Sequence, residues 1–133
     1  MYPKTHIILG VIFVVILYFL FPSINMLNLF IIFLSSVLID VDHYIVYVKR
    51  KRKFGLMSAF LWYDKRIKEK KECGFHFLHT LEIHIFVLIL AFFWHILFFV
   101  FIGITFHSIT DFIEIGPKGR EYFLTRWLIK KYS

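Results

Sequence analysis

The sequence lacks features that define several common classes of small protein. It has a single cysteine, Cys73, so no internal disulfide can form, and we interpret this lone thiol as a bystander and not as a metal ligand. No Ala-x-Ala-like cleavage site follows the first apolar run, so we expect that run to stay in the protein. There is also no internal repeat and no low-complexity segment. The length of 133 residues indicates one domain, which covers residues 1–133.

Apolar residues are what the chain has in excess. Of its 133 residues, 59% are hydrophobic and 18 are phenylalanine. A water-soluble domain of this size is only about half apolar. We therefore predict an all-α integral membrane protein of the cell membrane.

The positive charge of the chain indicates a lipid partner. The net charge is +7, but the basic residues lie beside apolar spans and not along a soluble face with interleaved aromatics, so we expect no nucleic-acid partner. Anionic lipid headgroups fit better. The uninterrupted basic block at 49–53 opens a cytoplasmic segment, 48–74, because such blocks do not cross membranes readily. In this segment we expect 54–63 to lie on the membrane surface and 64–72 to be a solvated loop or helix end.

Four apolar runs predict four short transmembrane helices, at about residues 5–21, 24–47, 75–93 and 96–114. The last two come from one stretch that is too long for a single span, which we divide near Trp94 and His95. The tail, 118–133, alternates basic and aromatic residues, which is typical of an interfacial amphipathic helix.

An up-and-down arrangement of these helices would bring their polar residues to one face. The start of the first helix, the end of the second, the start of the third and the end of the fourth then lie together. All 16 Lys and Arg residues lie on segments that return to that face, while the opposite turns at 22–28 and 94–95 carry no charged residue. The positive-inside rule places that face in the cytoplasm.

The polar residues at that face have the types and spacings of metal ligands. Residues three or four apart share a helix face, as Asp40 and His43 do. Asp42 is turned roughly 160° from Asp40 at about 100° per residue, so either it serves a second ion or the helix unwinds there. Mixed imidazole and carboxylate ligands favour Zn²⁺, Mn²⁺ or Fe²⁺. The candidate metal ligands are His6, Asp40, Asp42, His43, His79, Glu82, His107 and Asp111.

This set is about twice what one tetrahedral ion needs, so one or two ions are expected, and two could share a carboxylate. Two adjacent ions make a bound water nucleophilic and clamp the oxygens of a displacement at phosphorus. Asp42 or Glu82 could then act as the catalytic base. Neighbouring hydroxyls could orient the ligands. His76 is an open candidate, and His84 and His95 are interpreted as structural or as residues of the opposite interface. The neighbouring hydroxyls are those of Thr5, Thr80, Ser108 and Thr110.

These motifs resemble a known family. Thr-His opens the first helix, Asp40-Val41-Asp42-His43 closes the second, and His-x-x-x-Asp closes the last, as in membrane-bound metal-dependent hydrolases that include the LexA-regulated, YdjM-like inner-membrane proteins. The middle motif, His76 to Glu82, departs from the family's His-Arg-Gly-x-Thr-His-Ser. A more distant similarity to zinc-dependent phospholipase C implies a phosphoester substrate. The resemblance implies metal-site roles for Asp40, Asp42, His43, His107 and Asp111.

The leading hypothesis is a membrane-bound metal-dependent hydrolase of a phosphoester, with a membrane lipid as one candidate substrate. The alternative is a non-catalytic membrane protein in which a structural metal ion staples short helices. Metal transport is disfavoured because no second polar cluster leads to the opposite face. At each motif, an ordinary solvated helix end or hydrogen-bonded pair is the simpler interpretation. A closed four-ligand site favours the structural role, and two ions with an open position favour catalysis.

Overall fold

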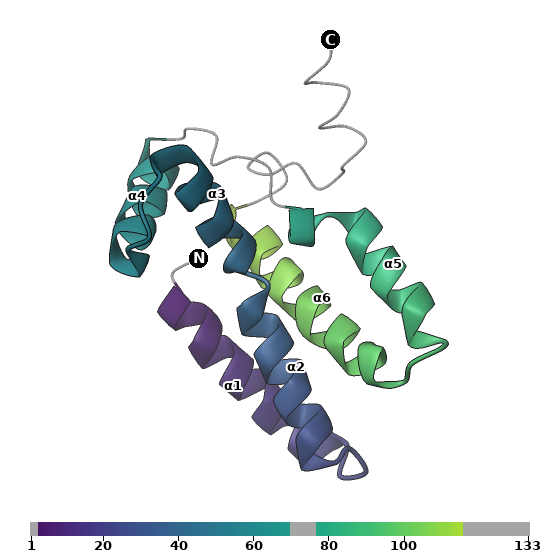
Figure 1. Cartoon of the computed structure of the whole chain (residues 1–133). Coiled ribbons are helices and arrows are strands. Elements are labelled where there is room, and N and C mark those ends of the chain that lie inside the picture. The colour runs from purple at the N-terminus through teal and green to yellow at the C-terminus, as the bar shows by residue number, and fades with distance from the viewer. Residues whose placement is uncertain (1–2, 70–76, 116–133) are drawn as a thin grey trace.

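The computed structural model describes residues 3–69 and 77–115, and within these ranges every regular element is a helix (Figure 1). The predicted interfacial tail and His76 lie outside the described residues. The all-α prediction is confirmed for the part that is described. In order, the elements are α1 (Pro3–Leu20), α2 (Met26–Leu38), α3 (Val41–Lys51), α4 (Leu56–Lys68), the short 3₁₀ helix η1 (Phe77–His79), α5 (Leu81–Ala91) and α6 (Ile96–Ile115).

Two stretches are long and apolar enough to cross a membrane, Met26–Lys51 and Ile96–Ile113. The stretches Thr5–Leu20 and Leu81–Ala91 are apolar but shorter. At about 1.5 Å per residue the 11 residues of α5 rise about 17 Å, whereas the hydrocarbon layer is about 30 Å thick. The structure thus supports two of the four predicted spans by length and composition.

The predicted helix at 24–47 is two helices, and the break falls at Ile39 and Asp40 (Figure 1). At the break the backbone bonds shorten to three-residue steps, from Asp40 N to the Val37 carbonyl and from Asp42 N to the Ile39 carbonyl. Such tightening is typical of a helix end. The sequence left two possibilities for Asp42, a second ion or an unwound helix. In the structure the helix is unwound at Asp40, the residue before α3.

Two further boundaries differ from the prediction. The span at 75–93 is interrupted because Thr80 is extended, with φ −80° and ψ 148°, so α5 begins only at Leu81. The segment predicted to lie on the membrane surface at 54–63 and to be a solvated loop or helix end at 64–72 includes a single helix, α4, which continues into the charged residues and ends at Lys68. Lys and Arg are good helix formers, so the change to charged residues does not by itself end the helix.

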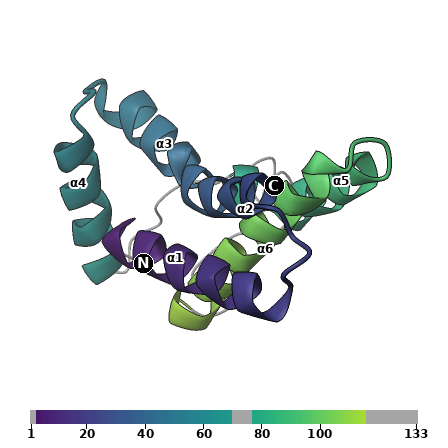
Figure 2. The same cartoon turned by 90° about the horizontal axis from the view of Figure 1, so that it is seen from below.

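Helix α2 lies between α1 and α6 and packs against both, and α5 packs on α6 (Figures 1 and 2). Its buried centre is Leu29 and Ile32, which contact Phe99 of α6. Small residues allow the backbones of α2 and α6 to lie close together. A Cβ at Gly103 of α6 would overlap the Ser35 hydroxyl and the Ile32 carbonyl oxygen. Small residues at such positions let helix backbones approach closely, as in membrane helix pairs.

We expect Gly103→Ala to lower the free energy of unfolding by about 1–3 kcal/mol, the usual cost of overpacking, because the new methyl group meets backbone that cannot move aside. The measurement is chemical denaturation in detergent. Gly55→Ala is the matched control, since its Cβ meets only the Ser58 side chain at 3.1 Å, and it should stay within about 0.5 kcal/mol. Equal effects of the two changes would contradict the close approach of α2 and α6.

Candidate metal centre

Side chains from the N-terminal helix, the α2–α3 break, the 3₁₀ turn and α6 meet at one end of the helices. His6 lies in the first turn of α1, Asp40 at the break, His79 at the end of η1, and His107 and Asp111 in the last turns of α6. These residues are those that the up-and-down arrangement was expected to bring together. Two groups of them have ligand atoms that all lie within 4.8 Å of one another, so each group could hold a metal ion.

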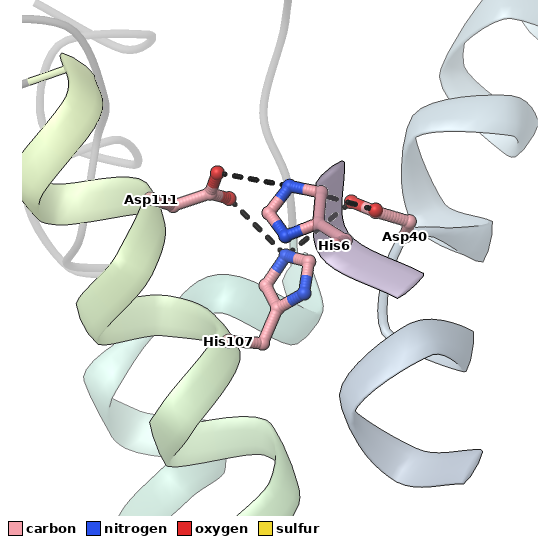
Figure 3. Close-up of side chains that lie close together, drawn as sticks. All are labelled: His6, Asp40, His107 and Asp111. Atoms are coloured by element: carbon pink, nitrogen blue, oxygen red, sulfur yellow. Dashed lines mark ion pairs between the residues drawn. The ribbon is translucent and has the colours of Figure 1, made fainter. Parts of the chain in front are cut away.

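The first group is His6, Asp40, His107 and Asp111 (Figure 3). The two oxygens of Asp111 face different imidazoles, with Oδ1 3.3 Å from His6 Nε2 and Oδ2 3.2 Å from His107 Nε2. Across from it, Asp40 Oδ1 lies 3.4 Å from His107 Nε2. The two imidazole rings stack with their centroids 4.1 Å apart. Two nitrogens and two carboxylates thus surround one point.

The second group is Asp40, His43 and His79, so Asp40 belongs to both groups. Its Oδ1 lies 3.3 Å from His43 Nδ1 and 3.9 Å from His79 Nε2. The groups also touch through their histidines, because His79 Nε2 and His107 Nε2 are 3.2 Å apart. The sequence hypothesis of a shared carboxylate is consistent with this arrangement.

Hydrogen bonds on the far side of each ring orient two of these imidazoles. His107 Nδ1 donates to the Ser36 carbonyl oxygen at 2.7 Å, and His79 Nδ1 donates to Asp42 Oδ2 at 2.9 Å. In the neutral ring, protonation at Nδ1 leaves the lone pair on Nε2, the nitrogen that faces the carboxylates. Metal-binding histidines are commonly held in this way by a backbone carbonyl or a carboxylate.

Burial differs across the centre. The side chains of His107 and Asp111 are each 1% exposed, whereas that of Asp40 is 27% exposed. Burying an ionised carboxylate this deeply costs much free energy unless it is paired or coordinates a cation. The donor set therefore fits a divalent cation, with one side of the centre open toward the surface.

Asp42 has a different place from the ligand or base predicted for it. Its Oδ2 accepts bonds from the Leu78 backbone N–H at 3.2 Å and from His79, and its Oδ1 lies 2.9 Å from His43 Nδ1. It is outside both ligand groups and contacts the second of them through His43 and His79. The break between α2 and α3 lets Asp42 face the 3₁₀ turn η1, where it bonds to Leu78 and His79.

Glu82, the other predicted base and ligand, belongs to neither group; it lies half-buried in the first turn of α5.

His84 has the structural role expected of it. Its Nδ1 donates to the Thr80 carbonyl oxygen at 2.9 Å, and its Nε2 lies 3.0 Å from the Ser108 hydroxyl, so it joins α5 to α6. His95 is exposed near the start of α6, at the opposite end from the centre.

Two of the predicted orienting hydroxyls bond to backbone. Thr80 donates to the Phe77 carbonyl at 2.9 Å, and Thr110 donates to the His107 carbonyl at 2.8 Å. The orienting group that sequence reasoning missed is the Ser36 carbonyl. No signal in the sequence could have found it, since every residue has a carbonyl and only tertiary packing selects one.

Comparisons of the chain with family profiles, with curated proteins and with solved structures find no match. The class of the protein therefore follows from its own features. It is all-helical in the described residues, has two candidate membrane spans, and carries a buried His and Asp cluster that could hold a metal ion.

We expect Asp42→Asn to weaken Zn²⁺ binding by about 10- to 100-fold, the usual effect of losing an outer partner of a metal-binding histidine. A neutral asparagine amide is a weaker acceptor than the carboxylate for the proton of His79 Nδ1, so the His79 ring is less basic and less firmly oriented. The measurement is the dissociation constant in detergent by competition with a chelating dye. Glu69→Gln is the control, because Glu69 pairs with Lys65 at 3.9 Å on the surface of the chain. An unchanged constant for Asp42→Asn would contradict the orienting role.

Proposed function

We propose that the protein is a membrane-bound, divalent-metal-dependent hydrolase that acts on a phosphoester. The observation that carries this proposal is the pair of ligand groups joined at Asp40, with the Nε2 atoms of His79 and His107 only 3.2 Å apart. Two imidazole nitrogens at this short distance, with carboxylates around them, are most simply explained by cations that lie between the imidazoles and the carboxylates.

The geometry favours two ions. Neighbouring ions in two-metal hydrolases lie about 3.5–4 Å apart and commonly share a ligand, and Asp40 is placed to be that ligand. Imidazole together with carboxylate suits Zn²⁺, Mn²⁺ or Fe²⁺ better than Ca²⁺ or Mg²⁺, which prefer oxygen ligands alone. We propose zinc as the first metal to test.

Exposure favours catalysis over a structural staple. A structural site is closed by its protein ligands, whereas a catalytic site keeps a position open for water or substrate. Here the side chains of Asp40 and His43 are 27% and 17% exposed, and they belong to the group nearer the surface. A phosphoester could reach this side of the centre while Asp111 and His107 hold the buried side.

Each residue then has a distinct task. Asp111, His107 and His6 would hold one ion, and His43 and His79 would hold the other, with Asp40 available to both. A pair of bound divalent ions supplies a nucleophile from water at neutral pH and stabilises the oxygens of an in-line displacement at phosphorus. Asp42 accepts from His79 Nδ1, so it would orient that ring and raise the basicity of its Nε2.

We also propose the membrane arrangement. The short stretches Thr5–Leu20 and Leu81–Ala91 would join the two longer ones in the bilayer and make a multi-pass protein. The basic run at 49–53 follows the centre directly, so the positive-inside rule places the centre at the cytoplasmic surface. The motif resemblance to membrane-bound metal-dependent hydrolases supports the same class.

The metal content of single variants tests the shared carboxylate. We expect about two ions per chain in the wild type and about one in His6→Ala or His43→Ala, because each variant loses a ligand of one group only, while Asp40→Ala weakens both groups. Elemental analysis of protein purified in detergent measures this, with His95→Ala, an exposed histidine far from the centre, as the control. One ion in every variant would favour the structural staple. If the wild type holds no more metal than a His6, His79 and His107 triple alanine variant, the proposal fails.

Hydrolysis of generic phosphomonoesters and phosphodiesters tests the catalytic role. We expect activity that is lost after chelation and returns with Zn²⁺, Mn²⁺ or Fe²⁺ but not with Ca²⁺, because four of the six proposed ligands are imidazoles. Asp42→Asn should lower kcat/KM by about 10- to 100-fold in protein that is fully loaded with metal, and His95→Ala should not change it. Loaded protein that hydrolyses neither substrate class would contradict the proposal.

A further inference from the structure

Helices α3 and α4 form an arm that leaves the bundle at the same end as the metal centre. Both views show α3 continuing away from α2 and α4 folding back beside it, on the side of the molecule away from α5 (Figures 1 and 2). The turn between the helices begins at Arg52, whose φ of 54° ends α3. We call residues 41–68 the α3–α4 arm.

One face of α4 packs on α3. Ala59 is buried, and the Trp62 ring lies edge-on to Tyr47 with centroids 5.8 Å apart. The guanidinium groups of Arg66 and Arg50 lie 5.0 Å and 6.0 Å from the centroid of the same indole ring. The Arg50 contact joins α3 to α4 and adds to their apolar packing, whereas Arg66 lies on α4 one turn after Trp62.

The opposite face of α4 is apolar and exposed. Met57 and Leu61 are four residues apart and so share a face, and they are 71% and 58% exposed. Leu56, the first residue of α4, and Phe54, two residues before the helix, are exposed to a similar degree. An apolar stripe of this kind marks a contact surface, because single scattered apolar residues would not line up along a helix.

Cations border this stripe. All five residues from Lys49 to Lys53 are basic and exposed, and they lead directly into Phe54 and Leu56. Large apolar side chains beside a dense cationic run fit a surface that is anionic on the outside and apolar just beneath. Among common partners, a bilayer with anionic phospholipid has this order of layers.

We propose that the α3–α4 arm docks on anionic phospholipid, with the basic run on the headgroups and the apolar stripe of α4 inserted just below them. The arm itself carries His43 of the second ligand group, and the Tyr63 ring of α4 stands edge-on to that imidazole with centroids 5.1 Å apart, so the arm docks at the outer side of the centre. Docking itself needs no metal. That the docked lipid supplies the phosphoester substrate rests on the proposed function.

The test places a fluorescent label on the stripe. The full chain with Cys73→Ser and Met57→Cys is labelled with bimane and reconstituted into phosphatidylcholine vesicles, with or without phosphatidylglycerol, that carry a spin-labelled lipid quencher. We expect stronger quenching in the anionic vesicles, which weakens as salt rises because the attraction is screened. Each cation removed should weaken docking by about fivefold. The Lys49→Gln, Lys51→Gln, Lys53→Gln variant should therefore lose the difference between the two vesicles.

The matched control keeps the charge. Lys49→Arg, Lys51→Arg, Lys53→Arg should quench as the unaltered arm does. Equal quenching in neutral and anionic vesicles, or a glutamine variant that behaves as the arginine variant, would overturn the proposal. A label that is protected from both lipid and aqueous quenchers would also overturn it, since a protein, such as a second copy of the chain, would then cover the stripe. Metal content measured on the same samples should be unchanged, so failure of docking is distinct from failure of the metal centre.

Discussion

The candidate metal centre depends on one hydrogen bond between two neighbouring helices, from His107 Nδ1 to the carbonyl oxygen of Ser36. The bond sets the height of α6 against α2 and the rotation of the imidazole at the same time. It forms because Gly103, one turn earlier on α6, lets the two backbones come close. A side chain at that position would move α6 outward, and both His107 and Asp111 would leave the centre with it.

A second constraint is the break between α2 and α3. An uninterrupted helix would turn Asp40 and Asp42 to nearly opposite sides and leave one of them toward lipid, where an ionised group is costly. The tightened turn at Ile39 and Asp40 lets Asp40 face the histidines of both groups while Asp42 faces the 3₁₀ turn and holds His79. The irregular backbone thus lies where it serves polar side chains, as is common at membrane depth.

The sequence was sufficient for features that depend on periodicity and connectivity. It predicted helical segments that include α1, α2, α5 and α6, and it placed His6, Asp40, His107 and Asp111 at one end because antiparallel helices must bring those ends together. It could not predict what depends on atomic contacts between distant segments. The bond between Asp42 and His79 joins residues from different helices, and the break at Thr80 depends on a backbone conformation that propensities do not fix. Glu82 is the clearest case, since its spacing from His79 suits a ligand only if one regular helix carries both residues, and the 3₁₀ turn interrupts it.

One half of the centre is buried and the other half is more exposed, and different parts of the structure cause this difference. Asp111 and His107 are buried because α6 lies in the middle of the packed helices, so their environment is set by the bundle. His43 lies on α3, outside the bundle, and its ring is covered by Tyr63 of α4. The inner half of the centre is therefore set by the packing of the bundle, whereas the exposure of the outer half depends on how α4 sits on α3. An arm whose position responds to a membrane surface would change the surroundings of His43, and it would leave the buried side chains of His107 and Asp111 unchanged.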